Sequence, residues 1–550
     1  MLVLVVGVLA SALVAGVATA EQTDESPAQV ASPDTVPSAI DSCAAEPPED
    51  FADPDGGTSD VIGWVDGYWY DEPLGFDVTG ELNETELEQL SARTAARVEA
   101  MRCLPVKDES VVQEVSIVDR ETFADEQADI FVGTDEQARL ADNAMFETLL
   151  LIDSQTDSVE VRLGDTSERV GGYYDYLAGE LVIISDDPES LTIEEQILAH
   201  ELNHAIQDQH FNLSQYDRTT TDRDLGKLGL IEGDVTLIEQ EYQQACEAGE
   251  WVEECLSQDH QPDLDVENWG LFMMDLQPYS DGSVFAYDIR EEEGWEGIDA
   301  LYEDPPTSAL HTVYPETYGS VDPESLDVPD RSTDEWERVV VDTPLADEAV
   351  DHDTLGVTPI TAMFAEPALE SRGAVQILSL QDLMEYGPFG EKDNYAHPEN
   401  EGWRGDELHT YVNDENETAT RWELQWATAE DAQPFVESYE ELVDIRGGDP
   451  VEGYSHTYEF DEETGYEMAV TIVPDGDRVT IATAPSVEAL TEVDTDIELL
   501  TEDNGEDDAD DTDADIADDA DDDGAGFGII VGVAAILTAT SGVLARRVVQ

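Results

Sequence analysis

The pattern of apolar and polar positions is clearest in residues 192–211, which read TIEEQILAHELNHAIQDQHF. At 3.6 residues per turn, apolar side chains fall on two opposite faces: Ile193, Ile197 and Phe211 beside two histidines, and Leu198, Leu202 and Ala205 across from them. Thr192 followed by Glu195 matches a capping box, which predicts that the helix begins at Thr192. Only a strip with Gln196, Asn203 and Gln207 is expected to face solvent, so the helix is predicted to be mostly buried.

The same periodicity predicts further helices at residues 82–104, 135–152 and about 223–248. Asn83 is expected to cap the first of them. Residues 111–119 alternate as a strand does, and residues 170–185, VGGYYDYLAGELVIIS, predict two short strands about a turn at Ala178 and Gly179. A strand directly before the 192–211 helix is well placed to pair with an extended peptide.

Residues 406–490 read strand, strand, helix, strand, strand, helix, which predicts a small α+β unit. The predicted fold class is therefore α+β throughout. We expect a mostly helical domain with a small β-sheet at 61–375, followed by a C-terminal α+β subdomain at 376–490. A Ser-, Pro- and acid-rich lead-in at 21–60 and an Asp-rich tether at 491–524 have compositions typical of disorder.

Both ends of the chain are apolar. Residues 1–20 end in Ala18-Thr19-Ala20 and predict a signal peptide, although no basic residues precede the apolar run, so an uncleaved helix is the alternative. Residues 525–547 are long enough for a transmembrane helix, with a buried core helix as the alternative. The basic pair Arg546-Arg547 predicts that the C-terminus is cytoplasmic and that the body of the protein is extracellular, anchored at the cell surface.

The charge of the chain is extreme, with 22 Lys+Arg against 132 Asp+Glu and a net charge of −110. Such a charge excludes nucleic acid as a partner. It suits a halophilic protein, because molar salt shortens the Debye length to about 3 Å and screens the self-repulsion.

The cysteines and sequons fit an oxidising exterior. Four cysteines predict two disulfides, Cys246 with Cys255 and Cys43 with Cys103, and four free buried thiols are the alternative. Glycosylation is possible in such a compartment at three sequons: Asn83, Asn212 and Asn416.

Residues 200–204 carry the H-E-x-x-H spacing. His200 and His204 lie one turn apart on one helical face and can bind the same metal ion. Glu201 lies about 100° further round, where it can hold a metal-bound water. Because buried histidines and carboxylates need partners, a metal is the simplest explanation of the group.

A third ligand comes from the next predicted helix. Glu232 follows His204 by 232−204 = 28 residues. Two histidines, one glutamate and an open position make a catalytic rather than a structural Zn²⁺ site. Asp208 and Asp234 are candidates to accept a hydrogen bond from the histidines, and an ordinary solvated or capping carboxylate is the equal alternative for each.

Several blocks together resemble the gluzincin-type metallopeptidases of bacteria and archaea. They are HELNHAIQDQHF, GLIEGDVT, QPYSDGSVFAYDI, EEGWEGIDALYEDPP, YPETY, GWRGD and EDAQPF, in this order. The resemblance implies a zincin-like fold, zinc at His200, His204 and Glu232, Glu201 as general base and acid, and a peptide or protein substrate. The tail is similar to archaeal sorting signals that begin Pro-Gly-Phe and are processed by an archaeosortase, but it begins Ala525-Gly526-Phe527.

One block departs from the family pattern. Ser308 matches, whereas Leu310 stands where the family has Glu and Tyr314 where it has His. Tyr314 is the candidate to donate a hydrogen bond to the oxyanion of the transition state. The sequence thus predicts a membrane-anchored extracellular zinc peptidase of a halophilic archaeon. The alternative is a catalytically weak zincin-fold surface protein with a binding or cell-envelope role.

Overall fold

The computed structural model describes residues 43–44, 61–76, 81–133, 135–188, 191, 193–253, 255–256, 266–341, 349–493 and 499. The predicted signal peptide, the predicted membrane segment at 525–547, and nearly all of the lead-in and the Asp-rich tether lie outside these residues. No helix in the described ranges is both long and apolar enough to cross a membrane. The described residues up to 493 belong to one compact α+β unit.

The helices of the described residues are α1 Glu84–Arg102, α2 Ser110–Gln113, α3 Arg120–Gly133, α4 Glu136–Thr148, α5 Ser158–Arg169, α6 Glu195–Phe211, α7 Thr221–Ala248, α8 Trp269–Glu293, α9 Trp295–Leu301, α10 Leu310–Val313, α11 Val357–Glu370, α12 Ala429–Arg446 and α13 Val487–Val493. A small sheet has the order β3-β5-β4, with β3 Ser116–Asp119, β5 Glu180–Ser185 and β4 Gly172–Asp175. β4 and β5 form the predicted antiparallel hairpin, and β3 pairs parallel to β5.

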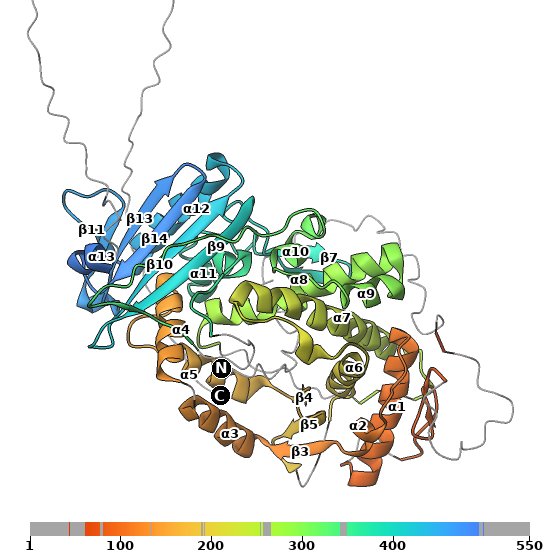
Figure 1. Cartoon of the computed structure of the whole chain (residues 1–550). Coiled ribbons are helices and arrows are strands. Elements are labelled where there is room, and N and C mark those ends of the chain that lie inside the picture. The colour runs from red at the N-terminus through yellow and green to blue at the C-terminus, as the bar shows by residue number, and fades with distance from the viewer. Residues whose placement is uncertain are drawn as a thin grey trace, which may run out of the picture. The chain divides into compact units, whose positions relative to one another are not determined.

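A larger sheet holds seven strands in the order β11-β12-β13-β14-β10-β9-β6. They are β6 Glu337–Arg338, β9 Trp403–Val412, β10 Thr418–Trp426, β11 Gly448–Pro450, β12 Thr457–Phe460, β13 Ala469–Asp475 and β14 Arg478–Ala484. Two hairpins complete the strands: β1 Trp64–Val65 with β2 Tyr68–Trp69, and β7 Met384–Gly387 with β8 Gly390–Asp393. Figure 1 shows α12 against the larger sheet, and α6, α7 and α8 beside one another.

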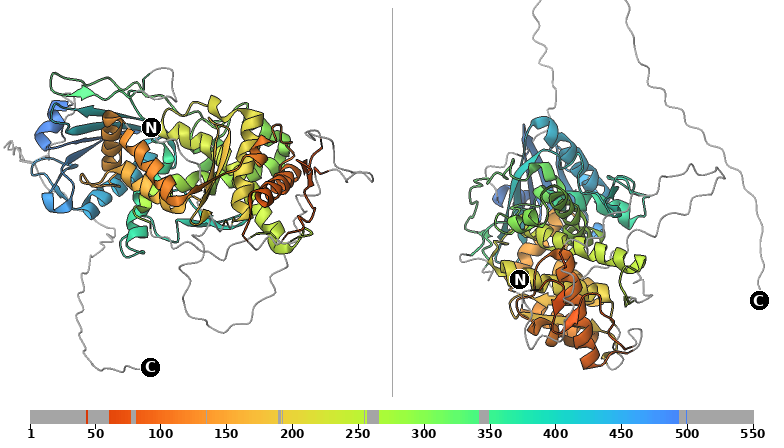
Figure 2. Two further views of the ribbon diagram at one scale, coloured as in Figure 1. Left: turned by 90° about the horizontal axis from the view of Figure 1, so that it is seen from below. Right: turned by 90° about the vertical axis from the view of Figure 1, so that its right-hand side faces the viewer.

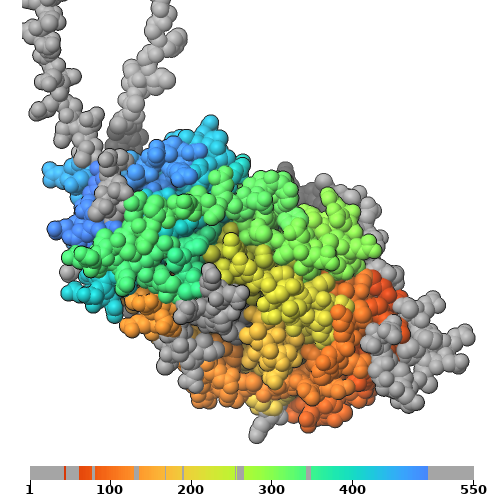
Figure 3. All heavy atoms as spheres, in the orientation of Figure 1, coloured from red at the N-terminus to blue at the C-terminus, as the bar shows by residue number. Residues whose placement is uncertain are grey.

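The larger sheet and the helical part share a core. Helix α4, from the N-terminal half, packs on β9 and β10, and the Oγ1 atoms of Thr148 and Thr420 are 2.7 Å apart. One cluster of buried apolar side chains extends in sequence from Met145 to Ile481. In the space-filling view the yellow segment around α6 and α7 lies between the orange and the green parts of the chain (Figure 3).

The start of α6 differs from the prediction. The helix begins at Glu195, three residues later than expected; Glu194 occupies its N-cap position, and Thr192 lies outside the described residues. Glu195 is the first residue of the helix rather than the third after its cap; its carboxylate is buried and accepts hydrogen bonds from Arg97 (2.5 Å) and Tyr242 (2.6 Å). A buried ion pair therefore fixes the beginning of this helix.

The two predicted disulfides are present, Cys246–Cys255 and Cys43–Cys103. The loop closed by Cys246–Cys255 carries Trp251, on whose ring the Arg97 guanidinium lies at 3.8 Å. The same loop brings the backbone of Leu256 to Glu195, where its N–H donates to the carboxylate at 3.1 Å. The loop thus covers the start of α6.

The predicted solvated strip of α6 is wrong. Asn203 and Gln207 are fully buried, and Gln196 is half-buried and donates to Glu239. The reason is that α6 is enclosed on several sides, because it contacts α1, α7, β4 and β5. In the turned view at the left of Figure 2, the yellow segment that includes α6 lies among orange and green segments of the chain.

Helices α7 and α8 touch at their backbones. A Cβ atom added to Gly233 would lie 2.3 Å from the carbonyl oxygen of Gly282, and one added to Gly282 would lie 2.3 Å from that of Gly229. Only glycine permits this approach. The contact sets the position of α7, and therefore of Glu232, which directly precedes Gly233.

Candidate metal centre

The structure brings together the three predicted ligands, two from α6 and one from α7. The Nε2 atoms of His200 and His204 are 3.1 Å apart, and each is 3.4 Å from Oε2 of Glu232. All three side chains are buried. Within the described ranges they form the one such group whose donor atoms could hold a metal ion.

The donor atoms fit a tetrahedral ion. Bonds of about 2.0–2.1 Å at tetrahedral angles separate the ligand atoms by about 3.3 Å, close to the three distances observed. Neither carboxylate oxygen of Glu232 has a hydrogen-bond partner within the described residues. A buried carboxylate facing two imidazole nitrogens requires a positive charge, which a divalent cation supplies.

The second nitrogen of His200 is held by a carboxylate. Its Nδ1 lies 2.9 Å from Oε2 of Glu239, which follows Glu232 by two turns of α7. Because an ionised carboxylate only accepts, Nδ1 carries the proton and Nε2 presents its lone pair to the ligand group. Glu239 was missed in the sequence, although its spacing of seven residues from Glu232 places it on the same helical face.

His204 is oriented by an amide. Its Nδ1 lies 3.1 Å from Oε1 of Gln207, while Nε2 of Gln207 donates to the carbonyl of Ile231 (3.1 Å) and to Asp234 (3.1 Å). These acceptors fix which end of the amide faces His204, so Nδ1 of His204 is the donor and Nε2 is free for the ligand group. Asp234 therefore supports His204 through Gln207 rather than by direct contact.

Asp208 has a different place from the one predicted. It accepts hydrogen bonds from the Tyr174 hydroxyl (3.2 Å) and from the backbone N–H of Leu213 (2.9 Å). Tyr174 belongs to β4, so Asp208 ties the outer strand of the small sheet to the end of α6. It holds the strand rather than a histidine.

Glu201 is a buried carboxylate beside the three ligands. Neither of its oxygens has a hydrogen-bond partner within the described residues. Burial raises its pKa to about 7; the two histidines lower it, and Glu232 and Glu239 raise it further. A Cβ atom added to Gly172 of β4 would lie 3.5 Å from Cγ of Glu201, so the strand runs directly beside this side chain.

The remaining charges suit metal binding. Burial by itself would raise the pKa of Glu232, but the positive charges that His204 and His200 carry when protonated outweigh it and lower that pKa to about 2. The Glu232 carboxylate is therefore ionised at any ordinary pH, which is the form that binds a metal.

A tyrosine from α8 completes the surroundings. The ring of Tyr279 lies nearly parallel to that of His200, with centroids 6.3 Å apart and 22° between the planes. Burial and the negative charges of Glu232 and Glu201 raise the pKa of Tyr279 well above its usual value, so its hydroxyl keeps its proton. In the sequence, Tyr279 falls in the block QPYSDG, which contributed to the resemblance but predicted no role for this residue.

Tyr314 has other partners than the one predicted. Its hydroxyl donates to Oδ1 of Asn400 at 2.7 Å and contacts the carbonyl of His397 at 3.3 Å. Leu310 is buried in the large apolar cluster, against which Tyr314 also packs. The altered block is thus part of the core, and we assign Tyr314 no catalytic role.

The predicted sequons all lie on the surface. Asn83, Asn212 and Asn416 are exposed, and the Asn83 side chain caps α1 as predicted by accepting from the Glu86 N–H at 3.2 Å. Their exposure is compatible with glycosylation.

Comparison with known proteins finds one similarity. A family model described as a domain of unknown function, DUF8575, matches residues 341–494. No curated protein and no solved structure matches the chain. The matched stretch contains most of the larger sheet and none of His200, Glu201, His204 and Glu232, so the family match does not bear on the chemistry of the site.

Proposed function

We propose that the protein is a zinc-dependent peptidase. The observation that carries the proposal is the unpartnered, buried carboxylate of Glu201 beside three converging ligand atoms. Two imidazoles and one carboxylate are ligands typical of catalytic zinc. Glu239 and Gln207 orient the two imidazoles, and a partner of this kind on the second ring nitrogen is typical of histidines that bind a metal.

Zinc bound by these ligands would supply Lewis acidity, polarising the substrate carbonyl and making water more acidic. Glu201 accepts a proton from the attacking water as the new C–O bond forms, and then delivers it to the leaving amine as the C–N bond breaks. Tyr279 is the candidate to donate a hydrogen bond to the oxyanion, in place of Tyr314.

The small sheet offers a place for the substrate. β4 is an outer strand, hydrogen-bonded to β5 on one side, and its Gly172 lies against Glu201. An extended peptide added to the outer side of β4 would run past Glu201 with its main chain held by strand pairing. A Cβ atom at Gly172 would lie 3.0 Å from the carbonyl oxygen of Val182 and 3.1 Å from Cδ1 of Ile183, so glycine allows the strand to lie this close to Glu201.

We further propose that the protein works at the outer surface of a halophilic archaeon, anchored in the membrane by residues 525–547. Two disulfides and three exposed sequons support an extracellular location. Processing of the tail by an archaeosortase belongs to the same proposal.

The test is Glu201→Gln, measured in molar salt. Glu201 is not a ligand, so the variant is expected to bind zinc as wild type does, while peptide cleavage falls by about 10²–10⁴-fold. His204→Ala is the matched comparison, because it is expected to lose zinc and activity together. Wild type and Glu201→Gln that are equally inert when fully loaded with zinc would contradict the peptidase proposal and favour a binding or cell-envelope role.

A further inference from the structure

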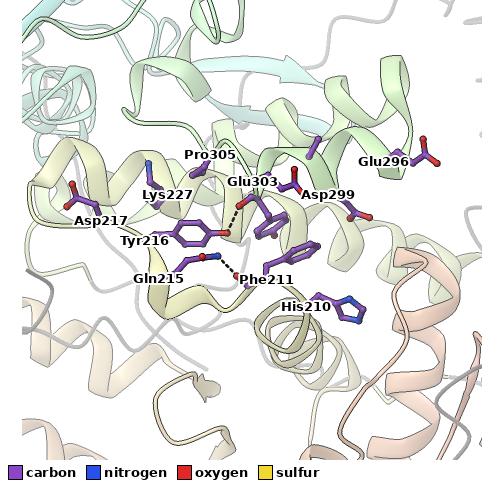
Figure 4. A pocket seen from close by; sticks show the side chains of 12 residues that line it. His210, Phe211, Gln215, Tyr216, Asp217, Lys227, Glu296, Asp299, Glu303 and Pro305 are labelled. Atoms are coloured by element: carbon purple, nitrogen blue, oxygen red, sulfur yellow. Dashed lines mark hydrogen bonds between the residues drawn. The ribbon is translucent and has the colours of Figure 1, made fainter.

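A cavity of about 880 Å³ opens at the C-terminal end of α6, apart from the ligand atoms (Figure 4). Its lining includes three aromatic rings: Phe211, Tyr216 and Tyr302. The rings of Phe211 and Tyr302 are stacked, with centroids 3.9 Å apart and planes within 7°. The Tyr216 hydroxyl donates to the backbone oxygen of Tyr302 at 3.0 Å. These contacts join the three rings into one fixed aromatic wall.

The rest of the lining includes four acidic residues: Asp217, Glu296, Asp299 and Glu303. Two of them are paired: Asp217 with Arg223 at 2.7 Å and Asp299 with Arg102 at 2.8 Å. The carboxylates of Glu296 and Glu303 have no ion-pair or hydrogen-bond partner within the described residues. Lys227 also lines the cavity, but its ammonium donates to the carbonyl of Pro306. Two exposed carboxylates of the lining, those of Glu296 and Glu303, are thus left without a compensating charge in the part of the chain that the structure describes, and Glu296 points away from the rings (Figure 4).

We propose that this cavity binds a small organic cation, of the alkylammonium or quaternary ammonium class. A cation with an apolar body is attracted by aromatic ring faces and by carboxylates at the same time. The volume lies in the range of small-molecule sites. An anion would meet the uncompensated carboxylates, and a neutral apolar molecule would not use them.

The cavity is linked to the candidate metal centre by hydrogen bonds. The hydroxyl of Tyr302 donates to Asp234 at 2.9 Å and accepts from Nε2 of Gln207 at 2.7 Å, and Gln207 in turn holds His204. Tyr302 is buried behind the half-buried ring of Phe211, on which it is stacked. A cation against the ring of Phe211 therefore stabilises, through the stacked pair, the position from which the Tyr302 hydroxyl holds Gln207. Binding is therefore coupled to zinc affinity, and this second half of the inference rests on the proposed zinc site.

Binding is tested on the metal-free protein in molar KCl by titration calorimetry, with choline as the probe and 3,3-dimethyl-1-butanol as its neutral analogue. Choline is expected to bind and the analogue not. Phe211→Leu and Glu303→Gln should each weaken choline binding by about three- to tenfold, whereas Glu292→Gln, an exposed carboxylate of α8 outside the lining, should not. Equal binding of both probes, or no binding of choline, overturns the inference.

Coupling is tested by measuring zinc affinity by chelator competition with and without choline. Saturating choline is expected to raise zinc affinity about fivefold in wild type, and zinc should raise choline affinity by the same factor. Tyr302→Phe keeps the ring but removes the hydroxyl, so it should still bind choline and lose the coupling. Choline binding without coupling in wild type overturns the regulatory half. Choline binding in a protein that binds no zinc would contradict only the proposed function.

Discussion

At the scale of single residues, the proposed function depends on how the ligands are held as much as on the ligands. Glu239 accepts from Nδ1 of His200, and no other partner of that nitrogen is found within the described residues. Removing such a partner leaves the imidazole free to rotate and to change tautomer. Loss of this partner should therefore lower the affinity for zinc, which can be measured without an assay of catalysis.

We therefore predict that Glu239→Ala weakens zinc binding by about 10–100-fold. Glu247→Ala, an exposed carboxylate on the same helix, is the control and should leave zinc affinity unchanged. Competition with a chromogenic chelator in molar salt measures both. Equal affinities in the two variants would show that the Glu239 contact has no part in metal binding.

A second prediction concerns a buried carboxylate in the first turn of α7, the helix that also carries Glu232. Asp222 is buried and accepts from the Ser308 hydroxyl (2.9 Å) and the Ala309 N–H (3.0 Å). Burial, with the charges of Asp406 and Asp353, raises its pKa to about 8 against the opposing effect of those two hydrogen bonds. Between about pH 4 and pH 8 the folded chain keeps a proton that the unfolded chain has released, so stability falls as the pH rises through this window.

Asp222→Asn removes this titration. The free energy of unfolding of wild type should decrease more steeply from pH 5 to pH 8 than that of the variant, by at most about 1.4 kcal/mol per pH unit. Denaturant titrations in molar salt at several pH values measure the slope, and Asp449→Asn, at an exposed position, is the control. Parallel slopes in wild type and Asp222→Asn would contradict the assignment.

The sequence predicted the group formed by His200, His204 and Glu232, which could hold a metal ion, but it did not predict the residues that orient this group. His200, His204 and Glu232 could be found because the spacing on one helix and one downstream carboxylate define the chemistry. Gln207 looked solvated because helical projection shows only one helix, whereas its partners, Ile231 and Asp234 of α7 and Tyr302, belong to other elements. Tyr314 was predicted to stabilise the oxyanion because of its position in a block that resembles the family. Its hydrogen bond to Asn400 shows instead that it belongs to the core.

At the scale of elements, the strands and helices near the site follow local signals. The hairpin β4–β5 and the Asn83 cap of α1 were predicted because turn and cap residues act within a few positions. The strand expected at 111–119 is instead the short helix α2 followed by β3. β11 and β12 were not expected either, because such short strands carry little periodicity and are defined by their partners in the sheet.

The glycine contact between α7 and α8 gives a prediction at this scale. In Gly233→Ala the new methyl group would meet the backbone of Gly282, which cannot turn away as a side chain can. We expect the helices to separate, moving Glu232, with a loss of zinc affinity and a destabilisation of about 1–3 kcal/mol.

Gly164→Ala in α5 is the matched control. Its added Cβ atom would find only Oε2 of Glu267, at 3.8 Å, and alanine favours helix over glycine by about 1 kcal/mol. This variant should be at least as stable as wild type and bind zinc normally. Thermal unfolding measures the stability of both variants, and chelator competition measures their zinc affinity. If Gly233→Ala behaves like Gly164→Ala in both measurements, the close contact between the helices does not position Glu232.

At the scale of the whole molecule, the net negative charge determines the salt concentration at which these variants have to be measured. With a net charge of −110, the acidic side chains repel one another strongly unless salt screens their charges. Loss of activity on dilution would then report unfolding rather than chemistry, so each variant has to be compared with wild type at constant, molar salt. The shared core between α4 and the larger sheet means that unfolding of the sheet would also disturb the helical part.

The last prediction concerns the side of the cell membrane on which the body of the protein lies. If residues 525–547 span the membrane with Arg546-Arg547 inside, the Asp-rich stretch at 491–524 is the only connection between the anchor and the body. A protease added to intact cells in molar salt should cut this stretch and release a fragment that contains both disulfides, which non-reducing and reducing electrophoresis would distinguish. A cytoplasmic protein of the same cells serves as the control for lysis. Protection in intact cells together with cleavage after lysis would place the body inside, and the proposals for an extracellular peptidase and for glycosylation at Asn83, Asn212 and Asn416 would both fail.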